Sequence, residues 1–418
     1  MSLPLFLGVF GCQHGGIRND SSRVVSRDIK GDYAHVRGLE SWEFLNSDAE
    51  ESFLIGLGES SHGSGGFYEV KFEIIKYLVE KKGVRALLFE QPDAFTEPMK
   101  RFLSGESSDV IEPLKRFYKV WQAREIAKMF TWIRDFNQSH REDPILFYGY
   151  DTRQPAADGK ILKKFALSNG LRWQQFVKHC LVIDATEEDA SKTERRVFNH
   201  EKLINSQDFA SCNLAIDHLK AKLDLKLNAR GENRFQIQAA IDGYQAWLGQ
   251  MYYRNSDQPR SNSARDLGMA KKIINFSLHF LKGKPAVIWA HNAHILFNSN
   301  QLEFVSKDYR GTRTMGTRLR EFFGKKYHPI AISSYELGFR LSSLQPPIVK
   351  TAPASFLESY LFETFQDDVF LDKDHPLMTS LQTIWGDPSD DDPEMKAVLA
   401  NHFSGFIFLR KVQPMELL

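Results

Sequence analysis

Six short apolar runs, spread along the whole chain, constrain the fold more than any other feature of the sequence. Each run is rich in β-branched or aromatic residues and lacks the polar alternation of a strand with one face in water. Such runs are typical of strands that are covered on both faces. They are FLIGLG (53–58), RALLFE (85–90), ILFYGYD (145–151), AVIWAH (286–291), PIAISSYE (329–336) and GFIFLRK (405–411).

Helical patterns fill several of the intervals between these runs. Residues 67–82 carry apolar side chains at helical spacing and end before Gly83, a residue type that commonly terminates helices. Residues 123–138 place Ile126 and Met129 on one face of a second helix. Strands that alternate with helices predict an α/β fold with a mainly parallel central sheet and flanking helices.

The pattern changes in the middle of the chain, between residues 156 and 282. No run typical of a strand occurs there, and long amphipathic stretches follow one another. We predict a helical insertion that forms a cap over the sheet edge, a natural place for substrate selection. The predicted organisation is an N-terminal tail (1–30), an α/β catalytic core (31–155 and 283–418) and the cap (156–282), with a solvated acidic loop at 387–394.

Charge and cysteine content narrow the class of protein. The 418 residues include 54 basic and 53 acidic side chains, so the net charge of +1 provides no field for nucleic acid or an anionic membrane. Three cysteines without short spacing exclude a disulfide framework and a cysteine zinc cluster. We therefore interpret Cys180 and Cys212, both in helical patterns, as buried unreactive thiols.

The N-terminal segment MSLPLFLGVFGCQHGG allows two interpretations. The apolar stretch before Cys12 resembles the end of a bacterial lipoprotein signal, in which the cysteine carries the lipid anchor. The alternative is a tail with a chance cysteine. The two interpretations predict a cell-envelope lipoprotein and a cytoplasmic protein, respectively. No other apolar run approaches the roughly 18 residues that a membrane span requires.

Acids and histidines follow four of the predicted strands. The stretch LIGLGESSHGSGGF places Glu59 and His62 directly after the first strand. Because the carboxyl ends of parallel strands meet at one edge of a sheet, these side chains are expected to share a crevice. The others are Glu90 after the second strand, Asp151 after the third, and His291 and His294 after the fourth.

Three chemistries fit this set of side chains. A serine nucleophile requires G-x-S-x-G, but His62 occupies the position of the second glycine. Zinc accepts three histidines and a carboxylate, and a metal site would use Glu59, His62, His291 and His294. The third option needs no cofactor, because a histidine held by a carboxylate can act as a general base that activates water. The remaining histidines then donate to a developing oxyanion or protonate the leaving group.

A family resemblance extends over residues 50 to 335. The chain resembles the erythromycin esterase family of macrolide-inactivating hydrolases, whose members are also associated with exopolysaccharide biosynthesis. The matching motifs, in the family's order, are GESSHGSGGFYEVK, ALLFE, WIRDFN (132–137), YGYDTR (148–153), WAHNAH (289–294) and MGTRLRE (315–321).

The resemblance implies a hydrolase that cleaves a cyclic ester with activated water. It makes His62 the general base and Glu59 its neighbour, while Glu90 orients the water or the base. His291 and His294 would contact the ester and stabilise the intermediate. The residues expected to bind the small ester or lactone substrate are Lys71, Trp121, Asp151, Arg153 and Asn292, and no cofactor is implied.

One position departs from the family pattern. The family usually has arginine nine residues after the base histidine, where this chain has Lys71. Lysine keeps the charge but lacks the planar fork that holds a carboxylate bidentately. The resemblance therefore predicts a looser pairing with Glu59 or Glu90. Two alternatives remain beside the esterase: a metal-dependent hydrolase or peptidase at the same site, and a non-catalytic exopolysaccharide-associated protein with this fold.

Overall fold

The computed structural model describes residues 33–35, 42–43, 45, 53–225, 232–302, 309–388 and 393–418. Cys12 and the predicted lipoprotein segment lie outside the described residues. Within the part of the chain that is described, no helix is long and apolar enough to cross a bilayer.

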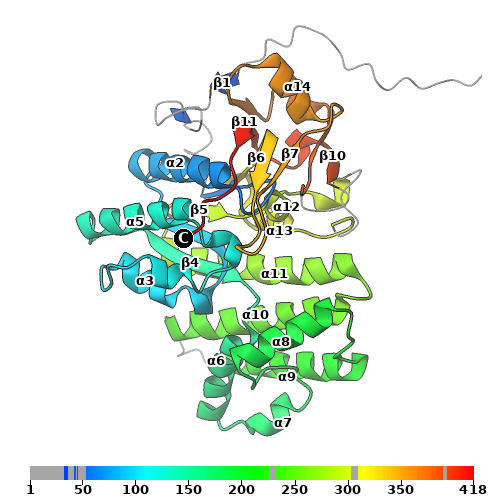
Figure 1. Ribbon diagram of the computed structural model, residues 1–418. Coiled ribbons are helices and arrows are strands. Elements are labelled where there is room, and N and C mark those ends of the chain that lie inside the picture. Colours follow the sequence, from blue (N-terminus) through cyan, green and yellow to red (C-terminus); the bar gives the residue numbers. More distant parts are fainter. Residues whose placement is uncertain are drawn as a thin grey trace, which may run out of the picture.

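A large β-sheet forms the centre of the molecule (Figure 1). All six apolar runs are strands in it, so the predicted strand positions are confirmed. The strands of this sheet are β1 (Tyr33–His35), β2 (Leu54–Leu57), β3 (Ala86–Pro92), β4 (Leu146–Asp151), β5 (Ala286–Trp289), β6 (Tyr327–Phe339), β7 (Ile348–Thr351), β8 (Val369–Asp372) and β11 (Gly405–Val412). A separate antiparallel pair consists of β9 (Leu381–Trp385) and β10 (Glu394–Val398).

The sheet is mainly parallel, as the sequence predicts. Its strand order is β1-β8-β11-β6-β2-β5-β3-β4, and β7 pairs with β6. Every neighbouring pair from β11 to β4 is parallel. The pairings made by β1, β7 and β8 are antiparallel. The carboxyl ends of β2, β3, β4 and β5 therefore lie together at one edge, and β4 is the last strand on its side.

Helices flank the sheet and make up most of the segment between β4 and β5. Those of the core are α2 (Gly65–Lys82), α3 (Glu97–Leu103), α4 (Ile111–Leu114), α5 (Arg124–Ser139), α12 (Asn292–Ile295), α13 (Met315–Phe323), α14 (Leu357–Thr364) and α15 (Pro376–Thr379). Those between β4 and β5 are α6 (Pro155–Ser168), α7 (Trp173–Val177), α8 (Glu187–Phe198), α9 (Ser206–Leu225), α10 (Glu232–Tyr253) and α11 (Gln258–Phe276), followed by a π turn, η4 (Ser277–Leu281). Short 3₁₀ turns are η2 (Asp93–Phe95), η3 (Lys119–Trp121), η5 (Ser299–Gln301), η6 (Gly324–Lys326) and η7 (Leu399–Asn401).

Alternate side chains of the strands build two cores, one on each face of the sheet. On β3, Phe89 points into the core shared with α2, α3 and α5, whereas Leu88 points into the core shared with α11, α13 and α14. This period of two is the reason that the buried strands read as unbroken apolar runs. Helix α2 ends where the sequence predicts, because Gly83 adopts a left-handed φ of 68° and its N–H bonds to the carbonyl of Leu78.

The described residues between β4 and β5 contain helices and turns but no strand, and they have a core of their own. Apolar side chains of α6 to α10 pack together, with Trp247 and Tyr244 fully buried among them. Helix α11 differs, because Met269 and Ile273 pack against the sheet. In Figure 1, α10 and α11 lie between the sheet and the rest of the segment. Helix α11 thus belongs to both layers.

The prediction for the two cap cysteines is wrong. Cys180 and Cys212 form a disulfide, not a pair of separate thiols. Their separation of 32 residues gave no local signal, because the pairing depends on how the turn after α7 packs against α9. Disulfides persist mainly in oxidising compartments. Closing a loop of this length stabilises a fold by roughly 4 kcal/mol in the chain-entropy model.

Candidate active site

The carboxyl ends of four neighbouring strands carry a compact group of ionisable side chains. Glu59 and His62 follow β2, and Glu90 and Asp151 lie within the last residues of β3 and β4. His291 follows β5 as the N-cap of α12. The strand ends therefore bring these side chains together, and all but Asp151 contact another member of the set directly.

His62 and Glu59 form the most direct pair. The Nδ1 of His62 lies 2.7 Å from Oε1 of Glu59, so the carboxylate accepts the Nδ1 proton and leaves the Nε2 lone pair for another partner. The His62 side chain is 27% exposed, while that of Glu59 is fully buried. His291 and His294 are each at most 4% exposed. Of these three imidazoles, only His62 can meet solvent or substrate without a rearrangement.

The neighbours of His62 set its charge and its orientation. Its ring contacts Trp121 edge-on at a centroid distance of 4.9 Å and His291 at 5.2 Å. Burial lowers the pKa of His62, but the hydrogen bond that His62 donates to Glu59 and the charges of Glu90 and Asp387 outweigh burial and raise the pKa above 6.5. The imidazole is therefore a stronger base than an ordinary histidine.

Lys71 lies behind this pair, fully buried in helix α2. Its Nζ donates to Oε2 of Glu59 at 2.7 Å and to the carbonyl of Ala290 at 3.1 Å. It also lies 4.4 Å from the centroid of the Trp289 ring. Burial lowers the pKa of Lys71, and the charge of Glu59 opposes that shift. The lysine thus pairs with Glu59 and not with Glu90, through a single charged hydrogen bond.

Glu90 and Asp151 are bridged by Arg265 from helix α11. The guanidinium donates to both oxygens of Asp151 and to Oε1 of Glu90, each at 3.0 Å. Burial alone would raise the pKa of Glu90, but the positive charges of His294, His62 and Arg265 lower it to about 2. The pKa of Asp151 is likewise held below its usual range, because Arg265 outweighs the effect of burial. Both carboxylates are therefore permanently charged.

His291 is held in one orientation by hydrogen bonds at both ring nitrogens. Its Nδ1 accepts from the backbone N–H of Ala293 at 3.2 Å, so Nε2 carries the proton and donates to the carbonyl of Ser60 at 3.0 Å. Burial lowers the pKa of His291, against the opposing charge of Asp387, whose carboxylate lies 3.7 Å from Nε2. The ring is therefore neutral, and it ties the loop of Glu59 and His62 to the end of β5.

His294 has the opposite character. Its Nδ1 lies 2.9 Å from Asp266, and its Nε2 lies 3.4 Å from Glu90 and 2.9 Å from Arg265. Burial lowers the pKa of His294, but Asp266 and Glu90 outweigh burial and raise it. The two histidines of WAHNAH thus have pKa values shifted in opposite directions, although they are three residues apart.

The other predicted substrate contacts occupy varied positions. Trp121 is 1% exposed and donates its indole N–H to the carbonyl of Glu90 at 3.2 Å, behind the ring of His62. Asn292 bonds through both ends of its amide to the backbone of Ile332 in β6. Gly58 is required beside it, because a β-carbon there would lie 1.9 Å from Asn292 Oδ1. Arg153 points to the cap, where it pairs with Glu194 of α8 at 2.9 Å.

The geometry also bears on the two other chemistries. Among the described residues, no three His, Cys, Asp or Glu side chains are grouped so that they could hold a metal ion. Both oxygens of Glu59 and both ring nitrogens of His291 already have partners, so the four residues of the metal alternative do not fit a cation. A serine nucleophile would need a hydrogen bond to a histidine. Nδ1 of His62 bonds to Glu59, and Ser60 Oγ has no hydrogen-bond partner among the described residues.

Sequence reasoning missed three charged residues of the cluster. Arg265 and Asp266 lie in α11, and a charged pair between apolar positions of that helix was the available signal. Asp387 belongs to the acidic stretch that we interpreted as a solvated loop, yet it lies beside His291. Tyr118 also donates its hydroxyl to Asp151 at 2.8 Å. No local pattern connects these residues to the strand ends, because helix packing and loop return place them there.

Comparisons with known proteins agree with this architecture. Over 461 aligned residues the chain is 23% identical to YbfO of Bacillus subtilis, a protein named as a hydrolase, with 99% of this chain and 97% of that protein covered. It is 23% identical to the erythromycin esterase type II of Escherichia coli, with 68% and 69% covered. A solved structure of an erythromycin esterase EreC mutant in its open conformation superposes with a TM-score of 0.69 at 16% identity, covering 92% of this chain and 99% of that one.

These findings support a hydrolase of the esterase type. The structural likeness shows the fold, and the hydrolase names come from the curated relatives. The family model named "Erythromycin esterase" matches residues 79–412, which include Glu90, Asp151, His291 and His294. The loop of Glu59 and His62 precedes the matched region. Because the match spans most of the chain, this protein belongs to the erythromycin esterase family.

Proposed function

We propose that this protein hydrolyses a cyclic ester, of the macrolide-lactone type, with His62 as the general base. The observation that carries the proposal is the His62–Glu59 pair. A buried carboxylate fixes the Nδ1–H tautomer, and the imidazole that it holds is 27% exposed at the carboxyl edge of the sheet. The resemblance of the sequence to macrolide-inactivating hydrolases and the name of the E. coli relative support the choice of substrate class.

The reaction needs no covalent intermediate with the protein. A water molecule donates a proton to Nε2 of His62 as its oxygen adds to the ester carbonyl carbon. Glu59 stabilises the imidazolium, and Lys71 keeps Glu59 ionised and in place. The tetrahedral intermediate then loses the ring oxygen as an alkoxide, which takes the proton from His62. The products are a carboxylic acid and an alcohol in one opened chain.

The other charged residues would support the oxyanion and the substrate. The ring of His291 lies 5.2 Å from the ring of His62, close enough to reach the same ester group. In this proposal His291 turns its Nε2–H away from the carbonyl of Ser60 and donates it to the developing oxyanion. Arg265 carries positive charge beside Glu90 and donates to Nε2 of His294. Glu90 then acts chiefly by holding these groups and by raising the pKa of His62. Selection among esters falls to the cap, whose helix α11 supplies Arg265.

The experiment is a product assay that identifies both the substrate and the attacking group. The purified full chain is incubated with a panel of lactones, including 14-membered macrolides, and with activated linear esters. Mass spectrometry follows the appearance of a product heavier by one water. A single turnover in ¹⁸O-labelled water is expected to place the label in the product carboxylate and none in the protein.

Two controls make the result decisive. His62→Asn keeps the size and polarity of the side chain but removes the base, so we expect it to remove turnover of every substrate on the panel. Arg153→Gln alters a charge that faces the cap, and we expect the rate to stay within a fewfold of the parent. Absence of turnover across the panel would contradict the proposal and favour a non-catalytic, exopolysaccharide-associated role. Label in a carboxylate side chain of the protein would show that an Asp or Glu attacks the ester instead.

A further inference from the structure

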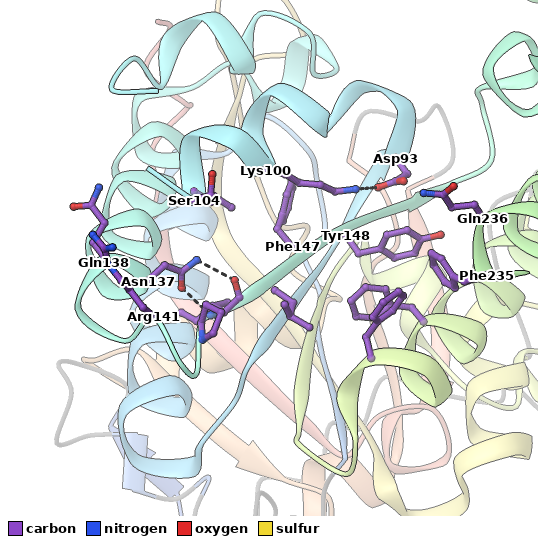
Figure 2. A pocket seen from close by; sticks show the side chains of 16 residues that line it. Asp93, Lys100, Ser104, Asn137, Gln138, Arg141, Phe147, Tyr148, Phe235 and Gln236 are labelled. Carbon is purple, nitrogen blue, oxygen red and sulfur yellow. Dashed lines mark hydrogen bonds and ion pairs between the residues drawn. The ribbon is translucent and has the colours of Figure 1, made fainter. Parts of the chain in front are cut away.

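A second cavity lies along the outer edge of strand β4, away from the catalytic side chains. Its volume is about 570 Å³. Pockets that bind small molecules commonly have volumes of 300–1,000 Å³. Figure 2 shows the cavity, with Tyr148 and Phe235 on one side, Asn137, Gln138 and Arg141 on the other, and the Asp93–Lys100 ion pair above. None of the residues assigned to the candidate active site lines it.

The start of the β4 edge is covered by a side chain, which limits what can bind there. The side-chain amide of Asn137 accepts from the N–H of Ile145 at 2.7 Å and donates to its carbonyl at 3.1 Å. A peptide added as a strand would need these backbone groups, so the cavity suits a small molecule better than a peptide.

One end of the cavity is aromatic. Tyr148 and Phe276 stack at a centroid distance of 4.7 Å, with an angle of 13° between the rings. Phe235 lies 5.6 Å from Tyr148 and 4.8 Å from Phe280. Phe235 is edge-on to both of its neighbours, so the four rings form a closely packed apolar lining, which favours a ligand with an apolar ring system.

The other end carries unbalanced positive charge. The lining includes one carboxylate, Asp93, and two cations, Lys100 and Arg141. Asp93 is already neutralised by Lys100 at 2.7 Å. Arg141 is exposed at the rim, and its guanidinium has no ion-pair or hydrogen-bond partner in the part of the chain that the structure describes. A guanidinium without a partner beside an apolar cavity favours a ligand with a carboxylate.

The cavity is also physically separate from the catalytic crevice. Tyr148 precedes Asp151 by three residues on the same strand, which corresponds to roughly 10 Å of extended backbone. The two sites thus lie along one strand, the cavity at its beginning and the crevice at its end.

We propose that the cavity at the edge of β4 is a binding site for a small aromatic or alicyclic carboxylate. The ring system of the ligand packs against Tyr148, Phe235 and Phe276, and its carboxylate pairs with Arg141. The site is distinct from the catalytic crevice and does not depend on His62.

The test uses 2-naphthoate and its uncharged analogue 2-naphthamide as probes, titrated calorimetrically into the purified full chain. We expect naphthoate to bind more tightly than naphthamide. Arg141→Gln should weaken naphthoate binding roughly fivefold, the size expected for an exposed charge pair, and leave naphthamide binding unchanged. The matched control is Arg101→Gln. Arg101 is also exposed, but it lies in helix α3 and does not line the cavity, so this variant should bind both probes as the parent does.

Two further variants place the probe. Ser104→Trp fills the cavity from its exposed rim, and it should weaken the binding of both probes more than tenfold without affecting esterase activity. His62→Ala should bind naphthoate as the parent does. The proposal is overturned if naphthoate does not bind, if Arg141→Gln behaves like Arg101→Gln, or if His62→Ala weakens binding. If Ser104→Trp fails to fold, the arginine pair and His62→Ala still decide the question.

Discussion

Two buried carboxyl groups in this protein have opposite properties, and the difference shows how the candidate active site keeps its charge. Glu90 in the candidate active site and Asp158 in helix α6 are both nearly inaccessible, at 3% and 0% exposure. The pKa of Glu90 is lowered to about 2, whereas that of Asp158 is raised to about 7. Burial alone raises the pKa of both, so the neighbours decide the outcome.

The neighbours differ in their hydrogen-bonding geometry. Glu90 accepts from the guanidinium of Arg265 and from the backbone N–H of His291, each at 3.0 Å. Asp158 accepts from the amide of Gln154 at 2.8 Å, and its second oxygen has no hydrogen-bond partner among the described residues. Lys272 lowers the pKa of Asp158, but its ammonium donates to the carbonyl of Asp151. Arg265, which bonds directly to Glu90, therefore keeps that carboxylate ionised. Lys272, which bonds to a backbone carbonyl, does not keep Asp158 ionised.

Glu358 in helix α14 repeats the behaviour of Asp158. It accepts from the hydroxyl of Ser333 at 2.6 Å and from the N–H of Trp385 at 3.1 Å. Burial outweighs these bonds and raises the pKa of Glu358 to about 7. Outside the crevice, folding thus favours the protonated form of Asp158 and Glu358. Inside the crevice, Glu90 and Asp151 are ionised.

The largest expected effect comes from removing the base of the ionic cluster. His62→Ala should lower kcat/KM for ester hydrolysis by about 10³-fold, because general bases contribute roughly 10² to 10⁴. The folded state should persist, since His62 is partly exposed. Steady-state kinetics and circular dichroism measure the two properties. Residual activity above a tenth of the parent would show that another group activates the water.

Removing Arg265 should leave Glu90 without a cation bonded to its carboxylate, as Asp158 is among the described residues. In Arg265→Met, Glu90 and Asp151 lose a shared partner, so we expect a loss of about 3–5 kcal/mol in the free energy of unfolding together with loss of activity. Arg153→Met is the matched control, because it breaks a more exposed pair with Glu194 and should cost about 1 kcal/mol or less. Urea unfolding measures both. Equal losses in the two variants would refute the special position of Arg265.

The complementary change concerns Asp158. Because its folded pKa of about 7 exceeds its unfolded value of 3.8, its contribution to stability is complete below pH 4 and is lost as pH rises through 7. The ionised form should therefore cost roughly 4 kcal/mol at pH 8. Asp158→Asn is expected to be more stable than the parent at pH 8 and not at pH 4. Urea midpoints at these two pH values provide the measurement, and a pH-independent difference would contradict the assignment.

The pH dependence of hydrolysis should report on the crevice itself. Because neutral His62 is the active form and its pKa is raised above 6.5, kcat/KM should increase with pH through a pKa above 6.5 and then level off. Glu90→Gln removes a charge that raises this pKa, so the rising limb should shift to lower pH. If the rising part of the pH profile does not shift in Glu90→Gln, then the charge of Glu90 does not influence the pKa of His62.

The smallest effect is expected at Lys71. Lys71→Met removes the cation that pairs with Glu59, so Glu59 should hold the His62 proton more strongly. The rising limb of the pH profile should then shift to higher pH by a fraction of a unit, opposite to Glu90→Gln. Lys71→Arg restores a cation and should return the limb toward its original position. Shifts of equal sign in Lys71→Met and Glu90→Gln would contradict this electrostatic account.

Much of the fold was predictable because its signals are local. The six parallel strands appear as apolar runs, since alternate side chains enter cores on both faces of the sheet. Helix α2 ends at Gly83 as expected. The crevice residues that end strands, such as Glu90 and His291, were found by the same reasoning, because parallel strands bring their carboxyl ends to one edge.

Other features had no local signal. The Cys180–Cys212 disulfide joins two segments of the helical insertion whose relative positions depend on tertiary packing, and the prediction of two thiols was wrong. Asp387 reaches His291 through a loop that its composition marks as solvated. Arg265 lies 114 residues beyond the Asp151 that it binds. The β4 cavity likewise depends on the gap that α3, α5 and α10 leave beside an edge strand.

The sequence by itself determined the strands, their common edge and the pairing of an acid with a histidine after β2, because each depends on residues close together in the chain or on the geometry of parallel strands. The tertiary structure decided which carboxyls remain charged, since that depends on the cations that helix packing brings into contact with them. Glu90 became an ion because α11 places Arg265 against it, and Asp158 became a weak acid because no cation among the described residues bonds to its oxygens.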